Sequence, residues 1–151
     1  MNRPKVTPVS ENNISAGEFF KIFTLHIGLD SIPETNDYTE YKYYAERATF
    51  FVAPWGGLSY EYFTEDGLMQ SISRAEVAFF IYSLGAMCKS IDDEKIVIDG
   101  SITDISHLYS GEERWIYACI QFDIIPADGN KFYPYAGVSH DEAVQFLKIV
   151  W

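Results

Sequence analysis

Three glutamates in this sequence stand at a spacing that invites a chemical role. Each lies three residues after a serine, in the pairs Ser15 and Glu18, Ser73 and Glu76, and Ser139 and Glu142. A carboxylic acid can act as a general acid. The same spacing is also that of a capping box, in which serine hydroxyl and glutamate carboxylate each accept a hydrogen bond from the other residue's amide. Because an aliphatic residue precedes each serine, we assign the three pairs to structural capping and predict no catalytic residue and no enzyme activity.

Arg74 follows the serine of the second box, near a helix start, where the helix dipole favours anions over cations. Two interpretations stay open: the side chain points into a groove toward an anionic ligand, or it forms a salt bridge with Glu76 or a nearby acid. His140 takes the same position in the third box, and either lines a groove or lies at a solvated helix start. His26 and His140 have no second histidine or cysteine at ligand spacing, so we predict no metal site and a partly buried core position for His26.

Aromatic residues make up 17% of the chain. Trp55 lies in the segment Pro54-Trp55-Gly56-Gly57, where the glycines permit a tight turn that presents the indole for sugar stacking. Packing is the open alternative. Trp115 belongs to an apolar helical pattern and is predicted to lie in the core, and Trp151 is predicted to close the last helix against its neighbours.

The elements that position these residues follow from hydrophobic periodicity. Positions four, seven, eight and eleven after each serine should form one helical stripe. They are Phe19, Ile22, Phe23 and His26, then Val77, Phe80, Ile81 and Leu84, then Ala143, Phe146, Leu147 and Val150. All but His26 are apolar, which predicts three equivalent helices packed about a shared axis.

The serines are 58 and then 66 residues apart, which leaves room for one more helix and a loop between successive boxes. Two further stripes occur within residues 38–53 and 111–123. Their members are Tyr41, Tyr44, Ala45, Ala48 and Val52, then Trp115, Ile116, Cys119 and Ile120. Pro54 and Pro126 should end these helices, and Asp128-Gly129-Asn130 should form a turn. Residues 95–98 favour a linker over a short strand.

Composition limits the class of protein. The 151 residues are 48% hydrophobic, enough for one compact domain, and no apolar run reaches the roughly 18 residues that a membrane helix needs. Residues 1–13 are polar with two prolines, so we expect a flexible segment that is neither anchor nor signal peptide. Both cysteines, Cys88 and Cys119, lie in apolar helical patterns and are predicted to be buried.

The formal net charge is -11, from 22 acidic and 11 basic residues. Such a charge repels phosphate backbones and acidic membrane surfaces at long range. We therefore expect neither a nucleic-acid partner nor membrane insertion.

The order of these features resembles the S-layer homology domain. Repeats of that family run from an aspartate through a tryptophan-bearing helix, an Asp-Gly loop and a Phe and Pro to Ile-Thr-Arg-Ala-Glu, which opens a second helix. The last repeat here reads Ile102-Thr103-Asp104-Ile105, Trp115, Asp128-Gly129-Asn130, Phe132-Tyr133-Pro134 and Val138-Ser139-His140-Asp141-Glu142. The middle repeat keeps Phe63, Asp66-Gly67 and Ile72-Ser73-Arg74-Ala75-Glu76, and the first keeps only its second helix.

The resemblance implies an all-α, pseudo-threefold module at 14–151, with repeats at about 14–30, 38–88 and 101–151. Its box-opened helices would form a central spindle, its other helices prongs, and the grooves would hold a secondary cell-wall polysaccharide. It implies a non-catalytic anchor, without cofactor, at the bacterial cell surface. The implied ligand-binding residues are Arg74, His140, Trp55, Asp104, Tyr133 and Tyr135.

Departures from the family pattern leave an alternative open. Members grip acidic sugar substituents with the box arginine, and only Arg74 is present here. Ala16 and His140 stand at the other two positions, and Asp141 adds a carboxylate. A neutral histidine cannot form the forked contact of an arginine with a carboxylate. The alternative is a protein-interaction or scaffold module that has lost glycan binding and has other surface proteins as partners.

Overall fold

The structure, a computed structural model, describes residues 12–28, 38–55 and 60–151, and within these ranges every regular element is a helix. The α-helices are α1 (Ala16–His26), α2 (Tyr38–Val52), α3 (Glu65–Met69), α4 (Arg74–Met87), α5 (Ser110–Gln121) and α6 (His140–Val150). Short 3-10 helices occupy Ala53–Trp55, Tyr60–Phe63 and Asp93–Lys95. The all-α prediction is therefore confirmed. In these ranges no helix combines the length and the apolar character needed to cross a membrane.

All three capping boxes form as predicted, at the starts of α1, α4 and α6. In each box the serine hydroxyl accepts a hydrogen bond of 3.1–3.2 Å from the glutamate amide, and the glutamate carboxylate accepts one of 2.7–2.9 Å from the serine amide. These bonds satisfy amides that a helix start otherwise leaves unpaired.

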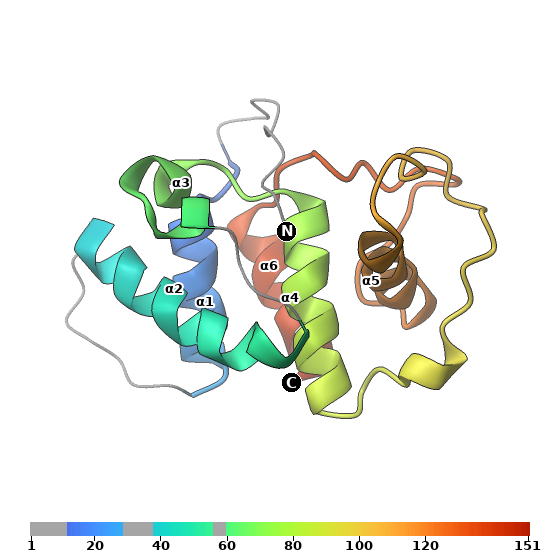
Figure 1. Cartoon of the computed structure of the whole chain (residues 1–151), viewed down its shortest axis with the longest axis horizontal. Helices are drawn as coiled ribbons and strands as arrows, with labels where there is room; N and C mark the ends of the chain where they lie inside the picture. Colours follow the sequence, from blue (N-terminus) through green and yellow to red (C-terminus); the bar gives the residue numbers. More distant parts are fainter. Residues whose placement is uncertain (1–11, 29–37, 56–59) are drawn as a thin grey trace.

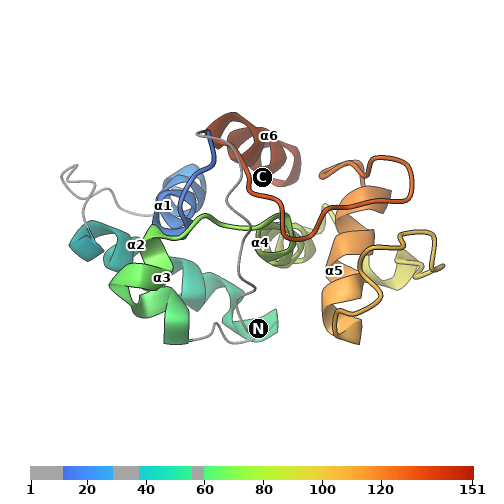
Figure 2. The ribbon, with the colours of Figure 1, turned by 90° about the horizontal axis from the view of Figure 1, so that it is seen from above.

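Helices α1, α4 and α6 lie together in the middle of the molecule, with α2 and α3 to one side and α5 to the other (Figures 1 and 2). Phe80 of α4 contacts Phe19, Phe20 and Phe23 of α1, with ring centroids 5.2–5.6 Å apart. Helix α6 contacts both α1 and α4. Of the twelve stripe positions only Ile22 and His26 are not fully buried. The predicted stripes thus form the core.

The chain segments that lead into the three helices pair with one another. Isolated bridges join Asn13 to Ser139, Ser15 to Ser71, and Ser73 to Gly137. Each bridge joins an N-cap serine to the residue two positions before another N-cap serine. The amide of Ile72 donates to the carbonyl of Ile14 at 3.1 Å, and that of Ile14 donates to Val138 at 2.9 Å. The three helix starts are therefore tied together by main-chain hydrogen bonds.

The other two long helices also follow their predicted stripes. All five stripe residues of α2 are buried, and α2 packs on α1. A Cβ atom at Gly17 would lie 2.5 Å from the ring of Tyr41, so only glycine permits this approach. Helix α5 packs on α4, where the rings of Trp115 and Phe79 are 4.5 Å apart. The core position predicted for Trp115 is confirmed, although its side chain is only partly buried.

Two burial predictions were wrong. Cys88 is exposed, because it is the C-cap residue of α4, at a helix end where Met87 and Lys89 are exposed as well. Trp151 is 53% exposed, because it follows the last turn of α6, beyond the buried Val150. Hydrophobic periodicity does not predict burial at such helix ends, because the last residues can lie beyond the packed core.

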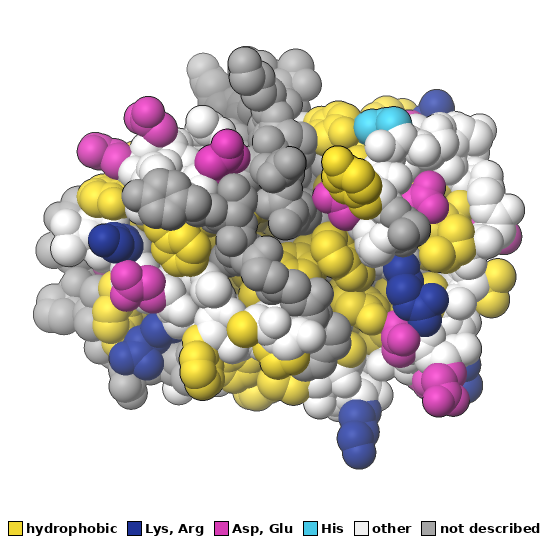
Figure 3. All heavy atoms as spheres, in the orientation of Figure 1, with side chains coloured by type: hydrophobic (Ala, Val, Ile, Leu, Met, Phe, Trp, Pro, Cys, Tyr) yellow, Lys and Arg dark blue, Asp and Glu magenta, His cyan; other side chains and the backbone are white. Residues whose placement is uncertain are grey.

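The remaining loops agree with their predictions where the structure describes them. Residues 95–98 form no strand, and a bridge between Asp128 and Lys131 closes the predicted turn, with Gly129 at φ 58°. Of the segment 1–13, the structure describes only Asn12 and Asn13. On the face drawn in Figure 3, acidic side chains are scattered over both ends of the molecule and hydrophobic side chains occupy much of the middle.

Candidate binding groove

Arg74 is the first residue of α4, and its side chain reaches the loop that follows α5. Nε donates to the carbonyl of Phe132 at 2.8 Å, and Nη2 donates to the carbonyl of Pro126 at 2.7 Å. The guanidinium also lies over the Phe132 ring, 4.8 Å from its centroid. The capping box places Arg74 at the helix start, and the returning loop supplies the acceptors. Arg74 therefore joins α4 to the segment 126–132.

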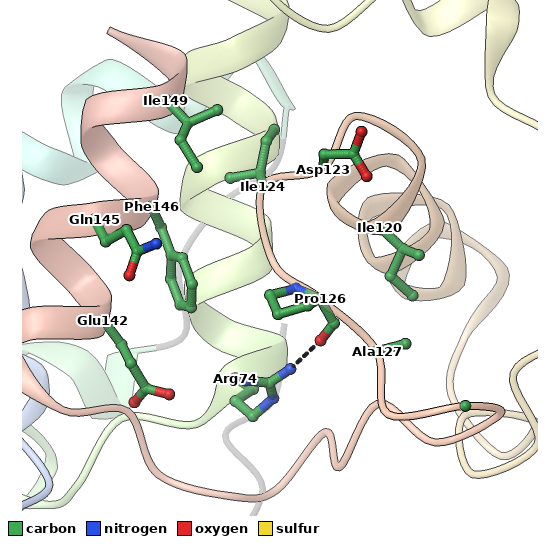
Figure 4. Close-up of a pocket in the computed structure, with 11 residues that line it drawn as sticks. Arg74, Ile120, Asp123, Ile124, Pro126, Ala127, Glu142, Gln145, Phe146 and Ile149 are labelled. Atoms are coloured by element: carbon green, nitrogen blue, oxygen red, sulfur yellow. Dashed lines mark hydrogen bonds between the residues drawn. The ribbon is translucent and has the colours of Figure 1, made fainter.

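A cavity of about 550 Å³ lies beside Arg74, between the end of α5, residues 123–129 and α6. Figure 4 shows Glu142, Gln145 and Phe146 of α6 on one side, and Ile120 and Asp123 on the other. A second cavity of about 350 Å³ shares Arg74, Pro126, Ala127 and Glu142 with the first and extends to Asp128 and Tyr133. We call the two cavities together the Arg74 groove.

The charge on Arg74 is set by opposing influences. Burial lowers the pKa of the guanidinium, while the carboxylates of Glu142 and then Asp104 act in the opposite direction. Because a guanidinium is not deprotonated in proteins near neutral pH, the side chain stays positive. The groove thus contains one permanent cation beside largely apolar walls.

Arg74 does not bond the glutamate of its own capping box. The guanidinium bonds the loop carbonyls and not Glu76. The carboxylate of Glu76 instead accepts from the amide of Ser73 at 2.7 Å and from the hydroxyl of Tyr62 at 2.6 Å. Arg74 therefore lines a groove and does not pair with Glu76, and the anionic ligand of the first interpretation stays a prediction.

Two of the other implied ligand-binding residues lie at this site. The carboxylate of Asp104 accepts hydrogen bonds from the amides of Phe132 (3.0 Å) and Tyr133 (2.8 Å), so Asp104 supports the groove loop from outside the cavities. Tyr133 is 51% exposed and lines the second cavity at a positive φ of 57°. Arg74 and Tyr133 thus line the same cavity, and Asp104 holds the main chain of Tyr133 in position from outside it.

The remaining implied residues lie elsewhere. Tyr135 is half-buried, and its hydroxyl is 2.5 Å from Nε2 of His107. His140 is exposed, with Nδ1 3.7 Å from the Asp141 carboxylate, so of its two predicted positions it has the solvated one. Neither lines the Arg74 groove. The side chain of Trp55 and residues 56–59 lie outside the described residues.

Several groove residues were not predicted as ligand-binding: Ile120, Asp123, Gln145 and Ile149, together with Glu142, which was assigned only to capping. Asp123 follows the C-cap of α5 at φ 55°, and no sequence motif marks it. Gln145 and Ile149 lie one helical turn apart on the exposed face of α6. Their exposure follows from their position outside the apolar stripe of α6. The sequence did not predict that the end of α5 and residues 123–129 lie across the groove from them.

Among the described residues, no three His, Cys, Asp or Glu side chains are grouped as ligands for a metal ion. No protein-family model matches the chain, and no curated protein is significantly similar to it.

Proposed function

We propose that this chain is a non-catalytic S-layer homology-like module that binds a secondary cell-wall polysaccharide in the Arg74 groove. The observation that carries the proposal is the position of Arg74. The arginine of the second box, which the family resemblance implies as a ligand-binding residue, lies in a groove between a box-opened helix pair and an intervening helix. The module would attach itself, or a longer protein, to the bacterial cell surface.

The arrangement of the helices supports a pseudo-threefold module. The bridges of Ser15, Ser73 and Ser139 relate the three helix starts in a cycle, because each serine takes the same position in its bridge. Helices α1, α4 and α6 would then be the spindle, and α2 and α5 two prongs.

The chemistry of the groove supports a saccharide ligand. Arg74 has five N–H donors, of which the two loop carbonyls occupy two, so three remain for ligand hydroxyl or carbonyl oxygens. The exposed ring of Tyr133 offers a flat face of the kind that packs against the C–H groups of a sugar. A concave site with apolar walls and a few polar groups is the usual form of a ligand site.

The test is retention of the purified chain by Gram-positive cell-wall sacculi. Gln145→Trp should fill the groove without removing any hydrogen bond of Arg74, and Lys148→Trp is the matched control on the exposed side of the same helix, outside the groove. We expect the wild type and Lys148→Trp to be retained, and Gln145→Trp to bind about tenfold more weakly. No retention by any sacculus contradicts glycan binding, and retention unaffected by Gln145→Trp places the site elsewhere.

A protein-interaction or scaffold role is the second candidate, favoured by the other two boxes. Ala16, at the position of Arg74 in the first box, is fully buried and too short to reach a ligand, while His140 is exposed and does not line the groove. At most one of the three boxes therefore carries an arginine that can bind a ligand. This candidate predicts that cell-wall sacculi do not retain the chain. It also predicts that Gln145→Trp leaves the binding of a protein partner unchanged.

A further inference from the structure

The Arg74 groove contains more negative than positive charge. The residues that line its two cavities include one cation, Arg74, and three carboxylates, Asp123, Asp128 and Glu142. Figure 4 shows Glu142 on α6 and Asp123 just after the end of α5, on opposite sides of the larger cavity that both residues line. An incoming anion would therefore meet a net negative surface.

The charge of Arg74 is also offset by the protein itself. Two main-chain carbonyl oxygens lie within 2.8 Å of its nitrogens, and the carboxylates of Glu142 and Asp104 act on it electrostatically. Glu142, as the capping residue of α6, also reduces the partial positive charge of that helix start. The groove thus lacks the uncompensated positive field that would select a carboxylate or phosphate ligand.

Resting on the proposed function, we propose that the glycan bound in this groove carries protonated amines, as a de-N-acetylated amino sugar does, and not carboxylate or phosphate groups. The ammonium groups pair with Asp123 and Glu142. The remaining donors of Arg74 bind sugar hydroxyl or acetamido oxygens, and the C–H faces of the sugar pack against Ile120 and Ile149. Carboxylates beside apolar walls attract a cation more strongly than they would in open water, and they repel an anion.

The test compares three series of oligosaccharides built from hexose units by calorimetric titration of the full chain. The series are glucosamine oligomers, N-acetylglucosamine oligomers and oligogalacturonate, which differ in charge. We expect glucosamine oligomers to bind about tenfold more tightly than the N-acetylated series, and oligogalacturonate most weakly. In parallel, N-acetylation of the amines in cell-wall sacculi should abolish retention of the chain.

A charge-neutralising double variant, Asp123→Asn with Glu142→Gln, tests which groups select the ligand. Asp123→Asn suits the positive φ of that position, and Glu142→Gln keeps a capping box, so the double variant should fold normally. It should lose the preference for glucosamine oligomers and gain affinity for oligogalacturonate. The control, Asp66→Asn with Asp141→Asn, removes the same charge from exposed positions outside the groove and should behave as the wild type.

The outcomes separate the two proposals. Preference for oligogalacturonate, or sacculus retention that survives N-acetylation, overturns the amine inference while glycan binding stands. No retention by any sacculus and no binding of any oligosaccharide overturns both. Binding of oligolysine, lost in the double variant, without glycan binding assigns the groove to a basic protein segment and also overturns the inference.

Discussion

The hydroxyl of Tyr62 donates a 2.6 Å hydrogen bond to the carboxylate of Glu76, which is completely buried. The same carboxylate caps α4 by accepting from the amide of Ser73 at 2.7 Å. Glu18 and Glu142 make the same capping bonds from exposed positions. Three boxes that are alike in sequence therefore differ in burial, and the middle one also links α4 to the 3-10 helix Tyr60–Phe63.

This difference predicts unequal costs of truncation. Glu18→Ala and Glu142→Ala each lose a solvated capping interaction and should lower the free energy of unfolding by about 1 kcal/mol. Glu76→Ala leaves the Tyr62 hydroxyl and the Ser73 amide buried without their acceptor, and should cost about 3 kcal/mol. Urea denaturation of the three variants measures the ranking. Equal costs would show that the Tyr62 bond contributes nothing.

Arg74 should contribute to stability as well as to the groove. Arg74→Ala removes two charge-assisted hydrogen bonds to the loop carbonyls of Pro126 and Phe132, and should lower the free energy of unfolding by about 2–3 kcal/mol. Arg74→Lys should recover only part of this, because a lysine cannot reproduce the planar, forked geometry. The loop should also become more sensitive to proteolysis. Lys148→Ala, an exposed control, should change stability by less than about 0.5 kcal/mol.

Acid should weaken the contact between α4 and α5. Asp93 accepts hydrogen bonds from Nε of Arg114 (3.0 Å) and the hydroxyl of Tyr82 (2.6 Å), and these groups hold the pKa of its carboxyl below the ordinary value. A lowered folded-state pKa gives stability that is present above a pH of about 4 and is lost as pH falls through the folded value. Asp93→Asn should therefore be less stable than the wild type at pH 7. The difference should shrink in acid, and a constant difference in urea denaturation from neutral to acid pH would contradict this assignment.

Alkali should act through Tyr82. Burial and the hydrogen bond to Asp93 raise the pKa of Tyr82 to about 12. A raised pKa gives stability that is fully present below the unfolded value of about 10 and is lost as pH rises through the folded value. Tyr82→Phe should therefore show a shallower loss of stability than the wild type above a pH of about 10. Absorbance titration of tyrosinate in both proteins checks the assignment, since the variant should lack one late-titrating phenol.

The two cysteines should differ in reactivity. Cys88 is exposed, whereas Cys119 is buried, with its thiol 3.5 Å from the carbonyl of Ala78, and burial raises the pKa of the Cys119 thiol. The thiolate is the reactive form. The native chain should react with one equivalent of a disulfide reagent and the denatured chain with two. Cys88→Ser should abolish the native reaction, and rapid labelling of that variant would show that Cys119 is accessible.

Local patterns in the sequence are sufficient for the elements of the core. A capping box uses hydrogen bonds between residues three apart, and a stripe uses the helical period, so both are readable without tertiary information. This is why α1, α2, α4, α5 and α6 were predicted, with all three boxes. Helix α3 was not, because five residues are too few to display a helical period.

The sequence by itself therefore determined the five longer helices, where three of them begin, and which faces they bury. Only the tertiary structure decided that Arg74 bonds carbonyls 52 and 58 residues away, that Asp123 and Glu142 share its groove, and that His140 does not. The physical reason is the sequence separation between the residues that interact. Caps and stripes depend on neighbours within a few residues, whereas a groove depends on which helices pack together and where the connecting loop returns.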